Sequence, residues 1–304
     1  MSYVRDVADN TDLGILRWDE ARDCLVGMFG DTDPWGDNWK SPVVMCFDRD
    51  YRFIGIPGVV DGVQVVEQGF ARQLWAYPHN NPVFSTVLPT DFIRLGGWWY
   101  VSVMVTQGLG NEVWVEFQRS RDLVTWEHTG KYISPKEHPN MVMLSYDVFG
   151  DWVYIVGTGG LKRNMAVYMW RNKIEEFPHG EWVVANVAGF DPILFEPSGE
   201  LCLRNVDDAA VLSRFVNEQN NWRVEASVLD EPGKEWTSVT PVRVADHLEF
   251  PQLYGGFLSP LSKLGVQDGA KWFVSQWDTV SGDNDPYKVM LCKGTLPAIV
   301  HTST

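Results

Sequence analysis

The chain has 304 residues, of which 45% are hydrophobic, so it is long enough to bury a substantial core. Its formal net charge of −15 disfavours nucleic acid or an anionic membrane as a partner, because binding to phosphate surfaces depends on clustered lysine and arginine. A neutral substrate fits this charge better.

The sequence also restricts location and redox chemistry. The first ten residues contain no apolar stretch that resembles a secretion signal, and no run of about 18 apolar residues follows. We therefore expect a protein without a signal peptide that is made in the cytoplasm. The cysteines stand singly in apolar, strand-like segments without metal or redox spacing, and are predicted to be buried free thiols: Cys24, Cys46, Cys202 and Cys292.

Short apolar or alternating runs separated by Gly, Asp, Asn and Pro fill the chain, which predicts an all-β fold. The runs group into repeats of roughly 45 to 60 residues, which is the spacing of propeller blades. Five blades fit, in one domain spanning residues 1–304. Their first two strands are predicted at Leu13 to Trp18 and Cys24 to Phe29, Phe92 to Leu95 and Trp98 to Val105, Val142 to Val148 and Trp152 to Gly157, Leu201 to Val206 and Ala210 to Phe215, and Tyr254 to Ser259 and Lys271 to Gln276.

The N-terminal segment is expected to close the ring. An open ring leaves an unpaired edge, and Tyr3 to Val7 is predicted to add the outermost strand to blade five.

The first hairpin has an acid at each end. If Leu13 to Trp18 pairs with Cys24 to Phe29, Asp12 lies opposite Gly30 and Asp31. In a propeller, residues before the first strand and after the second strand of each blade surround the axis at one face. This rule gathers a central bowl of carboxylates and aromatic side chains that suits sugars, including Asp12, Asp31, Asp33, Asn140, Glu200, Tyr254, Trp277 and Asp278.

Cleavage of a glycosidic bond needs one carboxylic acid and one carboxylate. We predict Asp12 as the base, Glu200 as the acid, and Asp31 as a third carboxylate that raises the pKa of the acid or orients the sugar. The structural alternatives are a strand-terminating turn at residues 31–34 and an exposed position of Glu200 in a turn at residues 197–200.

Aromatic and polar side chains are predicted to bind substrate. Trp35 and Trp39 lie in a polar loop directly after the predicted site, where a flat ring can pack on a sugar. Arg163 follows a turn at the rim and either bonds sugar hydroxyls or forms an ion pair between blades. The acidic run at residues 278–285 is interpreted as a solvated loop rather than a calcium site, so no metal is predicted.

Several motifs resemble known families. The segment Ser120 to Glu127 resembles a structural turn of five-bladed furanosidase propellers that cleave arabinan and fructan. Further segments resemble a narrower family, a former domain of unknown function now associated with endo-D-arabinanases: TDLG at Thr11 to Gly14, GDT at Gly30 to Thr32, WKSPV at Trp39 to Val43, YGGFLSP at Tyr254 to Pro260, and SQWD followed by PYKVML at Ser275 to Leu291.

The resemblance implies an endo-acting hydrolase of α-D-arabinofuranosyl linkages in mycobacterial arabinogalactan and lipoarabinomannan, without a cofactor. We expect inversion of configuration, because a wide bowl can separate Asp12 from Glu200 enough to admit a water molecule. Because the chain lacks an export signal, we expect a bacteriophage protein that is carried on the virion with tail proteins or released at lysis. Two alternatives stay open: a non-catalytic receptor-binding propeller of a phage tail, and an L-arabinanase or fructan hydrolase.

Overall fold

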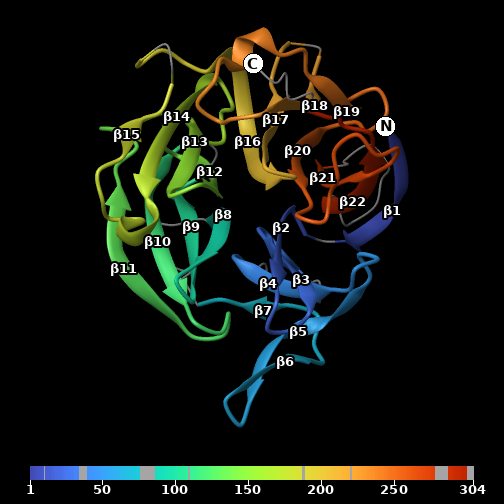
Figure 1. Cartoon of the computed structure of the whole chain (residues 1–304). Helices are drawn as coiled ribbons and strands as arrows, with labels where there is room; N and C mark the ends of the chain where they lie inside the picture. Colours follow the sequence, from blue (N-terminus) through green and yellow to red (C-terminus); the bar gives the residue numbers. More distant parts are fainter. Residues whose placement is uncertain are drawn as a thin grey trace.

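The protein is a five-bladed β-propeller in which antiparallel sheets surround a common axis (Figure 1). The computed structural model describes residues 1–9, 11–33, 40–75, 86–108, 110–186, 189–219, 221–277 and 287–299. Two short 3-10 helices, Ile174–Glu176 and Trp236–Ser238, lie in connections between strands. No helix in these described ranges has the length and apolarity needed to cross a membrane.

The first two blades differ at their outer edges. Blade two has four strands, β8 (Thr86–Leu95), β9 (Trp98–Thr106), β10 (Glu112–Ser120) and β11 (Trp126–Ile133). Blade one continues outward into a hairpin that projects from the ring (Figure 1), and its strands are β2 (Leu13–Asp19), β3 (Cys24–Phe29), β4 (Val43–Phe47), β5 (Phe53–Val60), β6 (Val63–Glu67) and β7 (Arg72–Gln73).

Blades three and four are joined into one sheet, because β14 pairs with the first part of β16. Blade three contains β12 (Met143–Phe149), β13 (Trp152–Thr158), β14 (Met165–Lys173) and β15 (Val183–Val184). Blade four contains β16 (Leu194–Val206), β17 (Ala209–Val216), β18 (Arg223–Leu229) and β19 (Val242–Asp246).

The two ends of the chain meet in blade five, which contains β20 (Leu253–Leu258), β21 (Ala270–Trp277), β22 (Tyr287–Gly294) and the N-terminal strand β1 (Ser2–Asp9). β1 runs antiparallel to β22, from Ser2 opposite Lys293 to Asp9 opposite Lys288. The predicted closure of the ring by the N-terminal segment is therefore confirmed.

Two innermost strands begin earlier than predicted. A turn was considered at residues 197–200, but Pro197 to Gly199 lie inside β16, and Pro89 lies inside β8. Register shifts accommodate them, between Pro89 and Asp91 on β8 and between Ser198 and Leu201 on β16. Glu200 is consequently a buried strand residue rather than an exposed turn residue.

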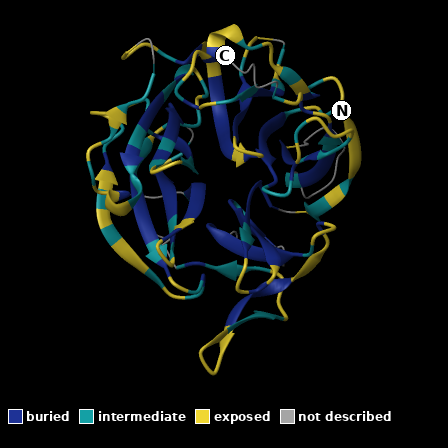
Figure 2. Ribbon diagram, in the orientation of Figure 1, coloured by how far each residue is buried: buried dark blue, intermediate teal, exposed yellow. Residues whose placement is uncertain are grey.

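The core lies between the blades and along the axis, where the inner strands are buried and the periphery is exposed (Figure 2). Trp99, Trp236 and Trp272 are among its largest fully buried side chains. All four cysteines are free and buried, as predicted. The turn after Ser120 is structural: its hydroxyl accepts hydrogen bonds from the backbone of Asp122 and Leu123.

Candidate active site

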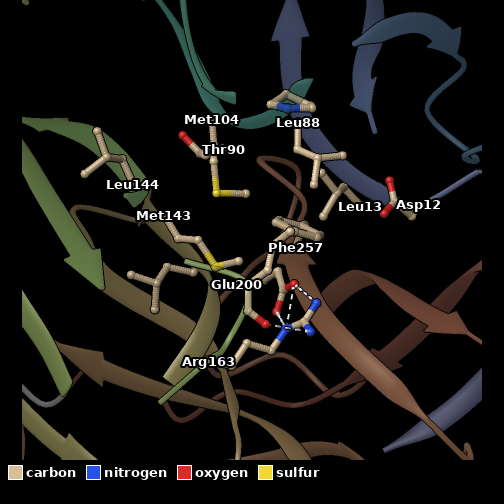
Figure 3. A pocket seen from close by; sticks show the side chains of 13 residues that line it. Asp12, Leu13, Leu88, Thr90, Met104, Met143, Leu144, Arg163, Glu200 and Phe257 are labelled. Carbon is tan, nitrogen blue, oxygen red and sulfur yellow. Dashed lines mark hydrogen bonds and ion pairs between the residues drawn. The ribbon is translucent and has the colours of Figure 1, made fainter. Parts of the chain in front are cut away.

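A cavity of about 520 Å³ opens around the axis where the innermost strands of several blades begin. Asp12 and Asp31 line it, together with Arg163, Tyr254 and Trp277, which confirms that these predicted residues share one cavity. A narrower extension toward the axis is also lined by Asp12 and Arg163, and Glu200 joins them there (Figure 3).

Asp12 is buried at the start of β2, and the local chain is shaped around its carboxyl group. The amide of Gly30 donates to the Asp12 carbonyl at 3.1 Å, which confirms the predicted pairing across the hairpin. A Cβ atom on Gly30 would lie 2.0 Å from Asp12 Oδ1, so only glycine leaves room for the carboxyl group. The GDT segment therefore makes space for an acid as well as supplying Asp31.

The two oxygens of Asp12 have different surroundings. Tyr254 donates its hydroxyl to Oδ2 at 3.2 Å, whereas Oδ1 is buried with no hydrogen-bond partner among the described residues. Burial and the nearby Asp31 carboxylate raise the pKa of Asp12 well above its ordinary value. Oδ1 is packed against Gly30, so it is the Asp12 side chain as a whole, and not this oxygen, that lines the cavity.

Glu200 is held by an arginine from the neighbouring blade. Arg163 Nε lies 3.0 Å from both carboxylate oxygens of Glu200, and Nη2 also donates to Oε1. The aliphatic stem of Arg163 crosses Gly199, where a Cβ atom would lie 2.7 Å from Arg163 Cγ. Burial by itself would lower the pKa of the Arg163 guanidinium. The Glu200 carboxylate has the larger effect in total, so the pKa is raised. The predicted ion pair between blades thus exists, and it lies inside the site.

The same arginine connects the two predicted catalytic groups. Its guanidinium lies 5.1 Å from the centre of the Tyr254 ring, and the hydroxyl of that ring donates to Asp12. Burial and the Asp12 carboxyl group raise the pKa of Tyr254 well above its ordinary value, so the hydroxyl keeps its proton and remains a donor. Tyr254 was predicted to bind substrate, and its observed contact is with the catalytic candidate Asp12.

Asp31 faces the cavity from the end of β3, and Thr86 of blade two donates to its Oδ1 at 2.6 Å. Burial and the charges of Asp12 and Asp31 raise the pKa of Tyr287. Tyr287 was not predicted as a site residue, because it begins a strand and its position at the rim follows only from the pairing of β21 with β22.

Aromatic rings form part of the rim. Trp277 and Tyr287 stack with their centroids 6.4 Å apart and their planes 19° apart. Asn217 and Trp222 line both the central cavity and a neighbouring cavity of about 490 Å³, so the two lie side by side at blade four. Trp222 is 40% exposed.

Two predicted binding residues do not face the central cavity. Asp33 is buried beyond the end of β3 and is absent from the cavity wall. Asn140 lines a separate cavity on blade three, because a turn closed by the Met141 amide and the His138 carbonyl carries it away from the axis. Trp35, Trp39 and Asp278 lie outside the described residues, as does the acidic run at residues 278–285. Within the described ranges, no group of three or more His, Cys, Asp or Glu side chains could hold a metal ion.

Solved structures share this fold at low sequence identity. The exo-β-1,3-galactanase from Clostridium thermocellum matches with a TM-score of 0.61 at 9% identity, over 92% of this chain and 58% of that one. The arabinanase Arb43A from Bacillus subtilis matches with a TM-score of 0.56 at 10% identity, over 95% and 96% of the two chains. An exo-1,5-α-L-arabinanase from a bovine ruminal metagenomic library matches with a TM-score of 0.55 at 12% identity, over 94% of both chains.

The fold and the cavity therefore define a five-bladed propeller with buried carboxyl groups around its axis. The chain belongs to the family described as Domain of unknown function (DUF4185), whose profile matches residues 6–293. A relative from Mycolicibacterium smegmatis, the "Uncharacterized 35.9 kDa protein in asd 3'region", is 30% identical over 292 residues. The match covers 83% of this chain and 81% of the relative.

Proposed function

We propose that this protein is an endo-acting glycoside hydrolase that cleaves α-D-arabinofuranosyl linkages in the D-arabinan of actinobacterial cell walls. The observation that carries the proposal is the convergence of Asp12 and Glu200, from blades one and four, on one narrow cavity at the axis. Two carboxyl groups in one cavity are the minimum that hydrolysis of a glycosidic bond requires. The structural neighbours named as arabinanases and a galactanase support the class of reaction.

In this proposal Asp12 is the base. Asp12 lines the cavity, and a water molecule there that donates to its carboxylate would take the position of the nucleophile. A raised pKa makes a carboxylate a stronger base, because a proton acceptor works best when its pKa lies near the operating pH.

Glu200 is the proposed acid, and Arg163 controls it. In the free site the guanidinium holds both carboxylate oxygens, so the contact must loosen before Glu200 can carry a proton to the leaving oxygen. Arg163 also lines the outer cavity, where a sugar hydroxyl can accept from its guanidinium and compete for it. Substrate binding would then free the acid at the moment it is needed.

The shape of the cavity favours action within a chain rather than at its end. The central cavity adjoins the neighbouring cavity at Asn217 and Trp222, and a polymer that lies over both would extend on that side of the cleavage point. The stacked Trp277 and Tyr287 rings offer a surface for a sugar ring at the rim. Delivery to the cell wall by a phage particle or by lysis is also part of the proposal.

The direct test is incubation with mycobacterial arabinogalactan, with L-arabinan and fructan as alternative substrates. We expect internal cleavage of the D-arabinan, seen as a ladder of oligosaccharides, and products of inverted configuration by NMR. Release of fragments only from L-arabinan or fructan would replace the proposed substrate. No cleavage of any of the three would reject hydrolysis.

An activated substrate assigns the two roles. An aryl arabinofuranoside oligomer with a good leaving group needs no proton, so it should restore activity to Glu200→Gln but not to Asp12→Asn. Restoration of Asp12→Asn alone would reverse the assignment.

One observation favours a second function. The ion pair with Arg163 keeps Glu200 from acting as a proton donor. A propeller that binds glycan without cleaving it would have the same arrangement. Retention of polymer of unchanged length in the incubation above would select this non-catalytic receptor-binding function.

A further inference from the structure

We propose that the cavity on blade three, which contains Asn140, is a second carbohydrate-binding site for neutral sugar residues. This cavity has a volume of about 300 Å³ and shares no lining residue with the central cavity. The turn before β12, the strands β14 and β15, and the segment before β16 form its wall. The proposal does not require that the central cavity cleave anything.

Aromatic rings dominate the wall of the blade-three cavity. Tyr168 and Trp170 are stacked, with centroids 6.2 Å apart and planes 24° apart, and Trp182 lines the same cavity. Phe190 stands at its edge with 86% of its surface exposed. Near-parallel rings beside an open cavity present the flat apolar faces against which the C–H faces of a sugar pack.

The polar groups of the wall suit hydroxyl groups rather than ions. His138, Asn140 and Asp191 supply donors and acceptors, and the lining contains no lysine or arginine that would attract an anion. A pocket for an apolar side chain of a partner protein would leave these groups unpaired. The wall therefore fits a ligand with one apolar face and many hydroxyls.

The floor of the cavity is built by close packing. A Cβ atom on Gly157 of β13 would lie 2.7 Å from the Asn140 carbonyl and 3.0 Å from the Trp170 ring. Glycine at this position lets the turn and the ring approach β13 together, so the cavity keeps its shape without a ligand.

The blade-three cavity lies near the proposed catalytic groups. Asn140 precedes Met143 by three residues, and Met143 lines the narrow cavity with Asp12 and Glu200. Three residues span at most about 10 Å. A second stretch or branch of the polysaccharide that occupies the central cavity can therefore reach this site, and binding at both would increase retention on the polymer.

The test measures binding without cleavage. In an Asp12→Asn background, the added pair Tyr168→Ala and Phe190→Ala is compared with Phe195→Ala, an exposed phenylalanine of the same blade junction that lies outside the cavity wall. Retardation is measured by affinity electrophoresis in gels containing arabinogalactan, L-arabinan or β-1,3-galactan, with melting temperatures as a check of folding.

We expect the pair to weaken binding to at least one polymer by about tenfold or more, and Phe195→Ala to leave it unchanged. Equal retardation of the pair and the background protein would overturn the proposal, as would the absence of retardation in all three gels. Retardation that depends on Tyr168 and Phe190 in a parent protein without hydrolytic activity would reject the proposed function while supporting this site.

Discussion

Two buried aspartates on innermost strands have opposite surroundings. Asp12 directly precedes β2 and lines the cavity. Its Oδ1 has no hydrogen-bond partner among the described residues, and its pKa is raised. Asp91 lies on β8, five residues beyond the cavity residue Thr86, which is about 16 Å along a strand. Burial would raise the pKa of Asp91, but Arg204 and Arg17 outweigh it and hold that pKa below its ordinary value.

Asp91 is fully engaged by three other blades. Its carboxylate accepts from Arg17 of blade one, from Arg204 of blade four, and from Ser145 and the Tyr146 amide of blade three. The same residue type thus ties the blades together at one level of the axis and stays unsatisfied at the other. The fold thus supplies direct cationic partners to the Asp91 carboxylate, whose pKa is lowered, and supplies none to Asp12 among the described residues, where the pKa is raised.

Replacement of Asp12 should have the largest effect and should fall on activity alone. For Asp12→Asn we expect about a 10³- to 10⁴-fold loss of kcat on arabinogalactan, because general-base catalysis is removed. The free energy of unfolding should not fall, because no ion pair of Asp12 among the described residues is broken and its buried carboxyl group carries a raised pKa. Full activity in this variant would remove Asp12 from the mechanism.

Replacement of Asp91 should lower the free energy of unfolding. Asp91→Asn leaves the buried Arg204 without its paired carboxylate and removes one of the two carboxylates beside Arg17, which costs about 3 to 5 kcal/mol in urea unfolding. Asp147→Asn is the matched control, because Asp147 contacts Arg17 from a partly exposed position and should cost much less. Equal losses in the two variants would show that the Asp91 cluster does not hold the blades.

The pH dependence of stability should have opposite signs at the two sites. The folded pKa of Asp12 lies above its ordinary value of 3.8, so its favourable contribution is lost as pH rises through the folded value. Asp12→Asn should therefore gain stability relative to the parent as pH rises from about 4.

For Asp91 the folded pKa is lowered, so its contribution is present above 3.8 and is lost as pH falls through the folded value. The deficit of Asp91→Asn should be complete at neutral pH and shrink in acid. Urea unfolding from pH 3 to 8 measures both trends, and parallel slopes would contradict the assigned charges.

The smallest expected effect concerns Tyr254. Its hydrogen bond to Asp12 lowers the pKa of that carboxyl group, so Tyr254→Phe should raise it further. If Asp12 is the base, the acid limb of the pH profile of kcat should move to higher pH. At pH values below this limb, kcat should fall by about tenfold or less. An unchanged acid limb would show that Tyr254 does not act through Asp12.

Much of the architecture was predictable because strand patterns are local. Alternating runs and turn residues indicated the first two strands of each blade, and the unpaired edge indicated the closing role of the N-terminus. Asp12 and Asp31 were also predictable, since hairpin register places residues at the two ends of a hairpin side by side. The β5–β6 hairpin was missed, because its short alternating runs resemble any edge strand.

Contacts between blades could not be read from the chain. Arg163 and Glu200 are 37 residues apart, and only the packing of blade three on blade four decides that they meet. Asn140 was misplaced because the rule for blade ends does not specify which way a turn carries its side chains.

The sequence by itself determined the strands, the fold class and the residue types available for chemistry, because these depend on periodicity and composition. Only the tertiary structure decided that Asp12 Oδ1 has no hydrogen-bond partner among the described residues, while the Asp91 carboxylate forms ion pairs with two arginines. The physical reason is that the charge state of a buried carboxyl group depends on neighbours that the fold brings from other blades.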